Sequence, residues 1–185
     1  MSFAKQIQMM ARNNAWSNDR LLRACAELSS DEFKAKRVSF FPSLCETLNH
    51  ILAIDCYYID ALVGGGIGPR AFYDYQPHDD VASLATAQRQ SDEQLIALCD
   101  RETNETLRMQ VPTDRGGAGI FPELRGNLLL HLFTHQIHHR GQAHAMLAGT
   151  VVKPPQLDEY FLDFDAGVRA DDLVRTGLPG PEAFR

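Results

Sequence analysis

Apolar residues recur at helical spacing in four long segments of this 185-residue chain. Steps of three and four between apolar positions are typical of helices that bury one face. The segments predicted as helices are about residues 3–28, 43–63, 81–105 and 122–148. Four long helices in one chain of this length predict an all-α domain built as a four-helix bundle.

The second predicted helix carries clear signals at both of its ends. Ser43 is followed three residues later by Glu46, which is the spacing of a capping box. The run VGGGIGPR then ends the helix, as glycine and proline do. We do not interpret this run as a phosphate loop, because it follows a helix and lacks the Gly-Lys-Ser/Thr ending.

The remaining segments predict smaller elements. The stretch RMQVPTDRGGAGIFPEL, which begins at Arg108, is rich in turn residues and predicts a small hairpin. The stretch QLDEYFLDF at residues 156–164 follows two prolines and predicts a short fifth helix. The final RTGLPGPEAFR predicts loose coil. We therefore place the bundle domain at residues 1–165 and a C-terminal tail at residues 166–185.

Composition narrows the class of protein and its surroundings. The net charge is -6 and the basic residues are scattered, which argues against binding to nucleic acid or to an anionic membrane. No apolar run approaches the roughly 20 residues of a membrane span, and the N-terminus lacks the apolar core of a secretory signal. The cysteines form no C-x-x-C motif, so we expect free thiols and a cytoplasmic protein. They are Cys25, Cys45, Cys56 and Cys99.

Five of the seven histidines lie in the stretch HLFTHQIHHRGQAHAML, from residue 131 to residue 147. On a helix, one inward stripe follows steps of three and four through Leu128, Leu132, His135, His139, Gln142 and Met146. His135 and His139 occupy the middle of this stripe, one turn apart. We expect His131 and His138 on its flank, and His144 on nearly the opposite, exposed side.

Two imidazoles at positions i and i+4 on an inward face can bind one transition metal ion, and such a site needs a third ligand. The candidates are His50, His78 and Asp55. His50 is the best of them, because it lies near the middle of a long helix. His78 lies in a polar loop, where we expect it to be solvated. The alternative is that the histidines are core residues that hydrogen-bond their neighbours.

Two carboxylates near the predicted site need separate explanations. Asp55 falls on the apolar face of its helix, where a carboxylate must be paired or bound. It can pair with a polar side chain of the first helix, which we favour, or orient an imidazole. Glu46 lies one turn before His50 and can also orient an imidazole. Neither has an assignable catalytic role, so the catalytic residues remain unknown at this stage.

The sequence resembles the DinB family, the DinB/YfiT-like metalloenzymes, in segments spread from about residue 3 to residue 160. The stretch NNAWSNDRLL is similar to the asparagine–aromatic–tryptophan–asparagine signature of that family. LNHILAIDCYY is similar to its second-helix histidine, with an aspartate five residues on. HQIHHRGQ is similar to its most characteristic stretch, H-x-x-H-H-R-G-Q, and PPQLDEYFLDF resembles a segment near its C-terminus.

The resemblance implies an up-down-down-up four-helix bundle, here with a short extra C-terminal helix. It also implies a metal site of three histidines, which are His50, His135 and His139 in this chain. We expect zinc or nickel, because both suit imidazole ligands. Arg140 would make a structural contact, Gly141 would allow close approach of a neighbouring helix, and Gln142 would contact a ligand or an imidazole.

Three neutral imidazoles leave positions open on the ion, which is typical of catalytic rather than structural sites. The family resemblance implies a metal-dependent enzyme that is a thiol-dependent S-transferase, or else a hydrolase, acting on a small electrophile. The expected partners are a small-molecule substrate, a low-molecular-weight thiol and, in a homodimer, a second copy of the chain. The alternatives are a non-enzymatic, stress-associated metal-binding bundle and a metal-free helical interaction module. We expect acid to release the metal near about pH 6, where imidazole protonates.

Overall fold

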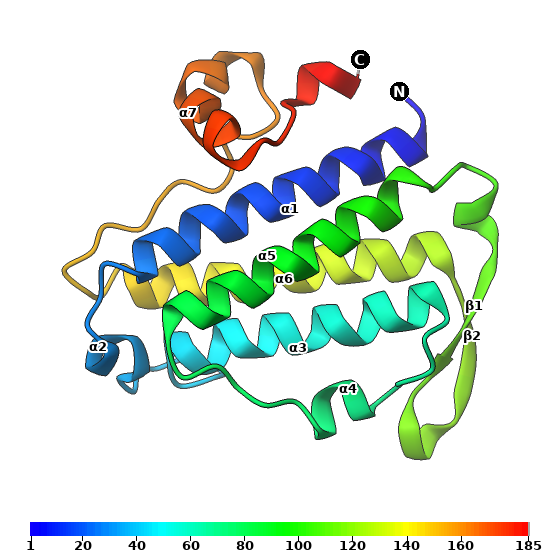
Figure 1. The fold of residues 1–185 in the computed structure, drawn as a ribbon, viewed down its shortest axis with the longest axis horizontal. Coiled ribbons are helices and arrows are strands. Elements are labelled where there is room, and N and C mark those ends of the chain that lie inside the picture. Colours follow the sequence, from blue (N-terminus) through cyan, green and yellow to red (C-terminus); the bar gives the residue numbers. More distant parts are fainter. Residues whose placement is uncertain (185) are drawn as a thin grey trace.

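The computed structural model describes residues 1–184 and shows four long helices packed side by side (Figure 1). These are α1 (Phe3–Cys25), α3 (Leu44–Val63), α5 (Val81–Asp100) and α6 (Arg125–Leu147). Figure 1 shows that α1 and α6 run in one direction while α3 and α5 run in the other. The up-down-down-up four-helix bundle implied by the resemblance is therefore confirmed.

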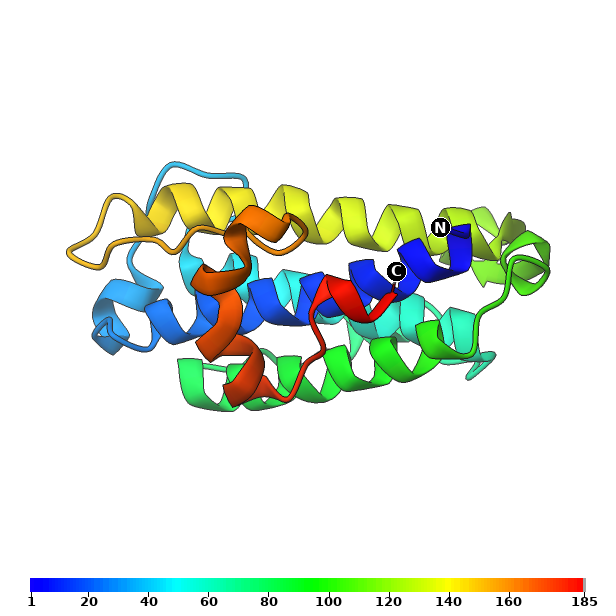
Figure 2. The same cartoon turned by 90° about the horizontal axis from the view of Figure 1, so that it is seen from above.

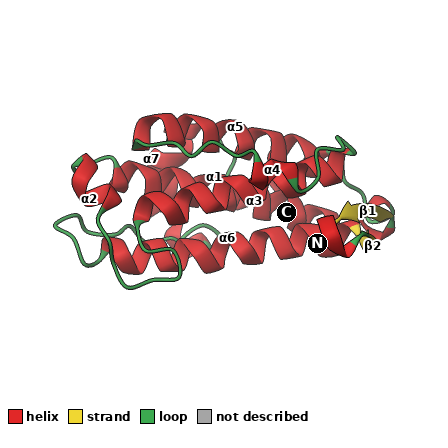
Figure 3. Ribbon diagram, turned by 90° about the horizontal axis from the view of Figure 1, so that it is seen from below, coloured by secondary structure: helices red, strands yellow, loops and turns green. Residues whose placement is uncertain are grey.

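Short elements connect the long helices. Helix α2 (Ser30–Lys34) lies between α1 and α3, and α4 (Arg70–Tyr73) lies in the long crossover between α3 and α5. The expected hairpin is present as β1 (Gln110–Asp114) and β2 (Ile120–Leu124), which pair antiparallel. It lies at the end of the bundle where α6 begins (Figure 3). None of the helices among the described residues is long and apolar enough to cross a membrane.

Local signals explain where α3 begins and ends. The side chain of Ser43 accepts a hydrogen bond from the backbone N–H of Glu46, as the capping spacing predicts. The helix ends at Gly64, whose φ of 73° is left-handed and favours glycine. Glu46 accepts a hydrogen bond from the Ser43 hydroxyl, so its carboxylate belongs to the helix cap and not to the histidines.

The C-terminal segment differs from the expectation. Residues 156–162 form no helix, and a 3-10 turn at Asp163–Asp165 leads into α7 (Ala166–Thr176). The expected position of the fifth helix is therefore wrong, and the final stretch expected as coil, residues 175–185, instead begins with the last residues of α7 and includes a 3-10 turn at Pro181–Phe184. The buried residues of α7 are Arg169 and Asp172, so its inward face is charged and shows no apolar periodicity. Figure 2 shows α7 lying across the long helices, on the outer side of α1.

Ion pairs and one aromatic contact attach this segment to α1. The Arg20 guanidinium lies 2.5 Å from a carboxylate oxygen of Asp172 and 2.9 Å from one of Glu159. Arg20 also lies over the ring of Trp16, which is fully buried and packs against Tyr160. The chain before α7 packs against α1 through Tyr160 and forms no helix there.

The apolar core consists of two clusters, one toward each end of the bundle. One contains the first half of α1 and the second half of α3, represented by Ile7 and Leu62. The other contains the second half of α1 and the first half of α3, represented by Leu21 and Leu48. Buried polar side chains separate the two clusters in the middle of the bundle.

Gly141 is exposed on α6, and a Cβ atom built there would meet no atom within 4 Å. The expectation that it allows close helix approach is therefore wrong. Gly126 has that role instead, because a Cβ there would lie 3.1 Å from the backbone oxygen of Leu107. The difference arises because Gly141 faces solvent and Gly126 faces the segment before the hairpin.

These two glycines form a matched pair for a stability test. We expect Gly141→Ala to raise the free energy of unfolding by about 0.5–1 kcal/mol, because glycine inside a helix costs conformational entropy. Gly126→Ala should lower it by about 1 kcal/mol or more, because the backbone of Leu107 cannot move away easily. Urea unfolding of both variants measures the two changes. Equal changes of one sign would contradict this assignment of the two environments.

Candidate metal centre

Three imidazoles from two antiparallel helices meet near the middle of the bundle. His50 comes from α3, while His135 and His139 come from successive turns of α6. The Nε2 atoms of His50 and His135 lie 3.0 Å apart, and one ligand atom from each histidine lies within 4.8 Å of the others. The structure thus brings together all three residues that the sequence predicts as metal ligands.

The separations suit the ligands of one divalent ion. Two nitrogen ligands at about 2.0–2.1 Å from a tetrahedral zinc ion lie about 3.3 Å apart. The 3.0 Å between His50 and His135 is close to that value. Two neutral imidazoles at this distance can otherwise share only one hydrogen bond, so an ion accounts better for the convergence of three.

Gln142 fixes the orientation of His139. The distance between His139 Nδ1 and Gln142 Oε1 is 2.7 Å, and an amide oxygen can only accept a hydrogen bond. Nδ1 of His139 therefore carries the proton, which leaves the lone pair of Nε2 free for a metal ion. This contact agrees with the expected role of Gln142 beside an imidazole.

Burial keeps the three histidines neutral. Desolvation, with the nearby His139 as a second cause, lowers the pKa of His50 to about 4. Desolvation and the surrounding histidines lower the pKa of His135 to about 3. The pKa of His139 is also lowered, mainly by desolvation. Neutral imidazole is the form that binds metal, so the site is prepared for an ion at neutral pH.

Two aromatic residues from the loop before α3 cover the histidines. The ring centre of Phe41 lies 4.2 Å from that of His50 and 5.6 Å from that of His139. The Phe40 ring lies 6.5 Å from that of His139 and is 76% exposed. Phe41 therefore shields the imidazoles from water on this side, while Phe40 extends outward.

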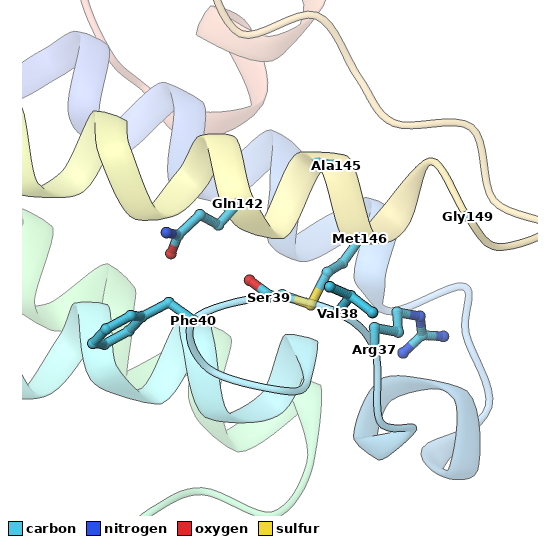
Figure 4. A pocket seen from close by; sticks show the side chains of 8 residues that line it. All are labelled: Arg37, Val38, Ser39, Phe40, Gln142, Ala145, Met146 and Gly149. Atoms are coloured by element: carbon cyan, nitrogen blue, oxygen red, sulfur yellow. The ribbon is translucent and has the colours of Figure 1, made fainter.

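A cavity of about 500 Å³ lies between the loop before α3 and the last part of α6, and none of the three histidines lines it (Figure 4). One wall is the loop before α3, with Val38 and Phe40, and the other is the last part of α6, with Gln142 and Met146. Gln142 thus contacts His139 and also lines the cavity. Gln142 and Phe40, which both lie against His139, therefore separate this cavity from the group of three histidines.

The other histidines lie outside this group. His131 and His138, which the helical phase places on the flank of the inward stripe, are exposed. His144 is half-buried rather than exposed, because its Nε2 atom lies 3.0 Å from the carbonyl oxygen of Pro155. His78 is half-buried in a loop whose backbone is fastened to Asn49 of α3.

Asp55 belongs to a buried polar network rather than to the metal group. Its carboxylate accepts hydrogen bonds from the side-chain amides of Gln88 and Gln136. The expected structural pairing of Asp55 is thus present, although its partners lie on α5 and α6 and not on the first helix. Desolvation raises the pKa of Asp55 to about 6.

Arg140 is the buried cation at the centre of the same network. Its guanidinium donates hydrogen bonds to the side-chain oxygens of Asn14, Asn18 and Gln136. The amide nitrogens of Asn14 and Asn18 donate in turn to Asp92. Each amide therefore turns its oxygen toward the cation and its nitrogen toward a carboxylate. The expected structural role of Arg140 agrees with this geometry.

Sequence reasoning missed most of this network and the aromatic cover. A signal was present, because polar residues recur at i and i+4 on inward faces of three helices. The pairs are Asn14–Asn18, Gln88–Asp92 and Gln136–Arg140. Phe40 and Phe41 gave no comparable signal, because residues 38–43 have no repeating structure that would show which way the side chains point.

Replacing the metal ligands tests the site directly. We expect His50→Ala, His135→Ala and His139→Ala each to lower the affinity for zinc or nickel by at least about tenfold, because each removes an inner ligand. His144→Ala is the matched control on the same helix and should keep full metal binding. Elemental analysis and metal titration measure both, and equal losses in the control and in His139→Ala would contradict the site.

The pH dependence of metal binding follows from the lowered pKa values. Protons compete with the ion only when the pH approaches the pKa of the ligands, which is about 4 for His50 and about 3 for His135. We therefore expect release between about pH 5 and pH 3, which replaces the value near pH 6 expected for ordinary imidazoles. Dialysis over this range, followed by elemental analysis, measures the release. Complete release already at about pH 6 would contradict this prediction, because it would mean that the imidazoles keep the pKa of histidines in water.

Comparisons with known proteins agree with the fold described above. "Protein DinB" of Bacillus subtilis (strain 168) is 25% identical over 141 residues, which cover 72% of this chain and 80% of the relative. "Uncharacterized protein YizA" of the same organism is 27% identical over 118 residues, which cover 64% of this chain and 71% of the relative.

Among solved structures, a DinB-like protein (YjoA) from Bacillus subtilis superimposes with a TM-score of 0.59 at 17% identity. The match covers 80% of this chain and 96% of that chain, and it supports the fold. The model of the DinB family matches residues 1–170, which is nearly the whole chain. The chain described here belongs to the DinB family.

Proposed function

We propose that this chain is a metal-dependent enzyme that joins a low-molecular-weight thiol to a small electrophile. The observation that carries the proposal is the convergence of His50, His135 and His139, with a cavity of about 500 Å³ beyond Gln142 and Phe40. Three protein ligands leave positions open on an ion, and the cavity gives a small molecule a place near them. This combination is typical of a catalytic site.

The surroundings of the histidines favour thiol transfer over hydrolysis. Hydrolysis usually needs a general base that removes a proton from water. Among the described residues, the group of metal-ligating side chains contains three histidines and no carboxylate. Glu46 caps α3, and Asp55 is held by two amides. A thiol needs less assistance, because it is far more acidic than water.

A bound zinc or nickel ion would supply the Lewis acidity that keeps a thiol as its thiolate at neutral pH. The chain contributes the rest. Gln142 accepts a hydrogen bond from Nδ1 of His139, so the Nε2 atom of His139 carries no proton and can bind a metal ion. Phe41 excludes water from His50, and Val38, Phe40 and Met146 give the electrophile an apolar surface.

Overall, the sulfur of the thiol forms a bond to the electrophilic carbon. The leaving group departs with the electron pair of the bond that breaks, and the thiol proton passes to solvent. The chain's own part is to place the electrophilic carbon within reach of the sulfur and to exclude water, which is the competing nucleophile.

The proposal places the enzyme in a reducing compartment such as the cytoplasm. All four cysteines in the chain are free thiols. Three of them are buried, and burial raises the pKa of Cys25 to about 12. Unreactive buried thiols persist where disulfides do not form, and low-molecular-weight thiols are abundant in the same compartments.

Turnover with a thiol and a chromogenic electrophile tests the proposal. Protein loaded with zinc or nickel is mixed with glutathione or cysteine and 1-chloro-2,4-dinitrobenzene, and absorbance follows the thioether product. We expect turnover above the uncatalysed rate for the unaltered chain and for His144→Ala, and background turnover for His139→Ala. Full metal binding without turnover across a panel of thiols and electrophiles would instead indicate a non-enzymatic metal-binding bundle.

A further inference from the structure

A second cavity, of about 430 Å³, lies between α1, α5 and the end of α7 with the residues that follow it. It is separate from the cavity lined by Gln142 and shares no lining residue with it. Its walls are largely apolar and include Ala15, Leu22 and Ala85. Its lining also includes three buried polar side chains, those of Asn18, Gln88 and Asp92, which belong to the network around Arg140.

Asp92 is the buried acidic group at this cavity. Its side chain is buried, with the residue 5% exposed, yet it borders the cavity. Its hydrogen-bond donors among the described residues are the neutral amides of Asn14, Asn18 and Gln88. Oδ1 of Asp92 accepts from all three of these residues, whereas Oδ2 accepts one bond of 3.2 Å, from Asn18. Oδ2 therefore retains capacity for a further donor.

The buried network has no cation in direct contact with either of its carboxyl groups. It contains two carboxylates, Asp55 and Asp92, and one guanidinium, that of Arg140. Arg140 reaches both carboxylates only through intervening amides. Desolvation, followed by repulsion from Asp55, raises the pKa of Asp92 to about 8. In the free protein Asp92 is therefore mainly protonated at neutral pH, and a bound cation would take the place of that proton by pairing with the buried carboxylate.

The rim of the cavity does not supply that cation. Arg175 lies 2.6 Å from Asp19 and 2.7 Å from Asp172, so its charge is already paired. Arg23 also pairs with Asp172, at 3.4 Å. Arg89 and Glu93 are exposed on successive turns of α5, where solvent screens both charges. The charged side chains at the rim therefore repel a cationic ligand only weakly.

We propose that this cavity binds a small organic cation, a primary ammonium group on a short apolar chain. The ammonium group would donate to Asp92 at the inner end, and the apolar chain would lie against Ala15, Leu22 and Ile96. An ammonium group fits this place because it brings both a charge that pairs with the carboxylate and further donors. The ligand class follows from Asp92 and the cavity walls, and it does not depend on the proposed transferase activity.

A series of isosteric probes tests the proposal on the full chain. Hexylamine, hexanol and hexanoate share one apolar chain and differ in the charge of the head group. Titration of each probe, followed by NMR of the isotopically labelled protein, gives the affinity and the residues affected. We expect hexylamine to bind saturably and to shift the signals of Leu22 and Ile96, and to bind at least about tenfold more tightly than hexanol.

Two matched variants on α5 identify the anchor. Asp92→Asn should weaken hexylamine at least tenfold, whereas Glu93→Gln, which removes an exposed carboxylate at the rim, should leave the affinity unchanged. Ala85→Leu, which narrows the cavity without touching the network, should weaken all probes and keeps the test available if Asp92→Asn does not fold. Circular dichroism verifies the fold of each variant.

Several outcomes would overturn the proposal. Equal affinity for hexylamine and hexanol would mean that the cavity selects only apolar chains. Tighter binding of hexanoate would place the anchor on the rim arginines. Signal shifts confined to Gln142 and Met146 would mean that the amine binds in the other cavity. Unchanged hexylamine affinity in folded Asp92→Asn would remove Asp92 as the anchor.

Discussion

The burial of the Arg140 charge in the middle of the bundle is the constraint on which the rest of the structure depends. A guanidinium cannot remain inside a protein without acceptors and negative charge nearby. Arg140 obtains acceptors from α1 and from its own helix, and carboxylates of α3 and α5 complete the network. All four long helices therefore contribute to one set of hydrogen bonds. That set forms only when each helix has one particular rotation about its axis and one particular position along that axis.

The group of three histidines takes its geometry from this constraint. On α6, Gln136 and Arg140 each follow a histidine of the metal group by one residue, so the polar network fixes the rotation that aims His135 and His139. On α3, Asp55 lies five residues after His50 and is held by amides of two other helices. The histidines are thus placed by groups that never contact a metal ion, which is how a rigid scaffold organises a site in advance.

The sequence predicted the elements whose signals are apolar and periodic. The four long helices followed from spacing, and the helical phase brought His135 and His139 to one inward face. The direction of the helices came from the family resemblance, because an antiparallel and a parallel neighbour present the same apolar stripe. His50 was favoured by its place on a long helix, and the resemblance implied it as well. Helix α7 escaped prediction because its buried residues, Arg169 and Asp172, are charged. The position of Phe41 could not be predicted, because the side chains of a loop follow no repeating pattern.

The charged face of α7 has a consequence for how the molecule comes apart. The long helices hold one another through buried apolar side chains, whereas α7 is attached to α1 largely through Arg20, Asp172 and Arg175. Salt weakens ion pairs near the surface but strengthens or leaves unchanged the burial of apolar groups. We therefore expect high salt to loosen the C-terminal segment before it affects the bundle beneath it. Such opening would uncover Trp16, the single tryptophan of the chain, without disturbing the histidines.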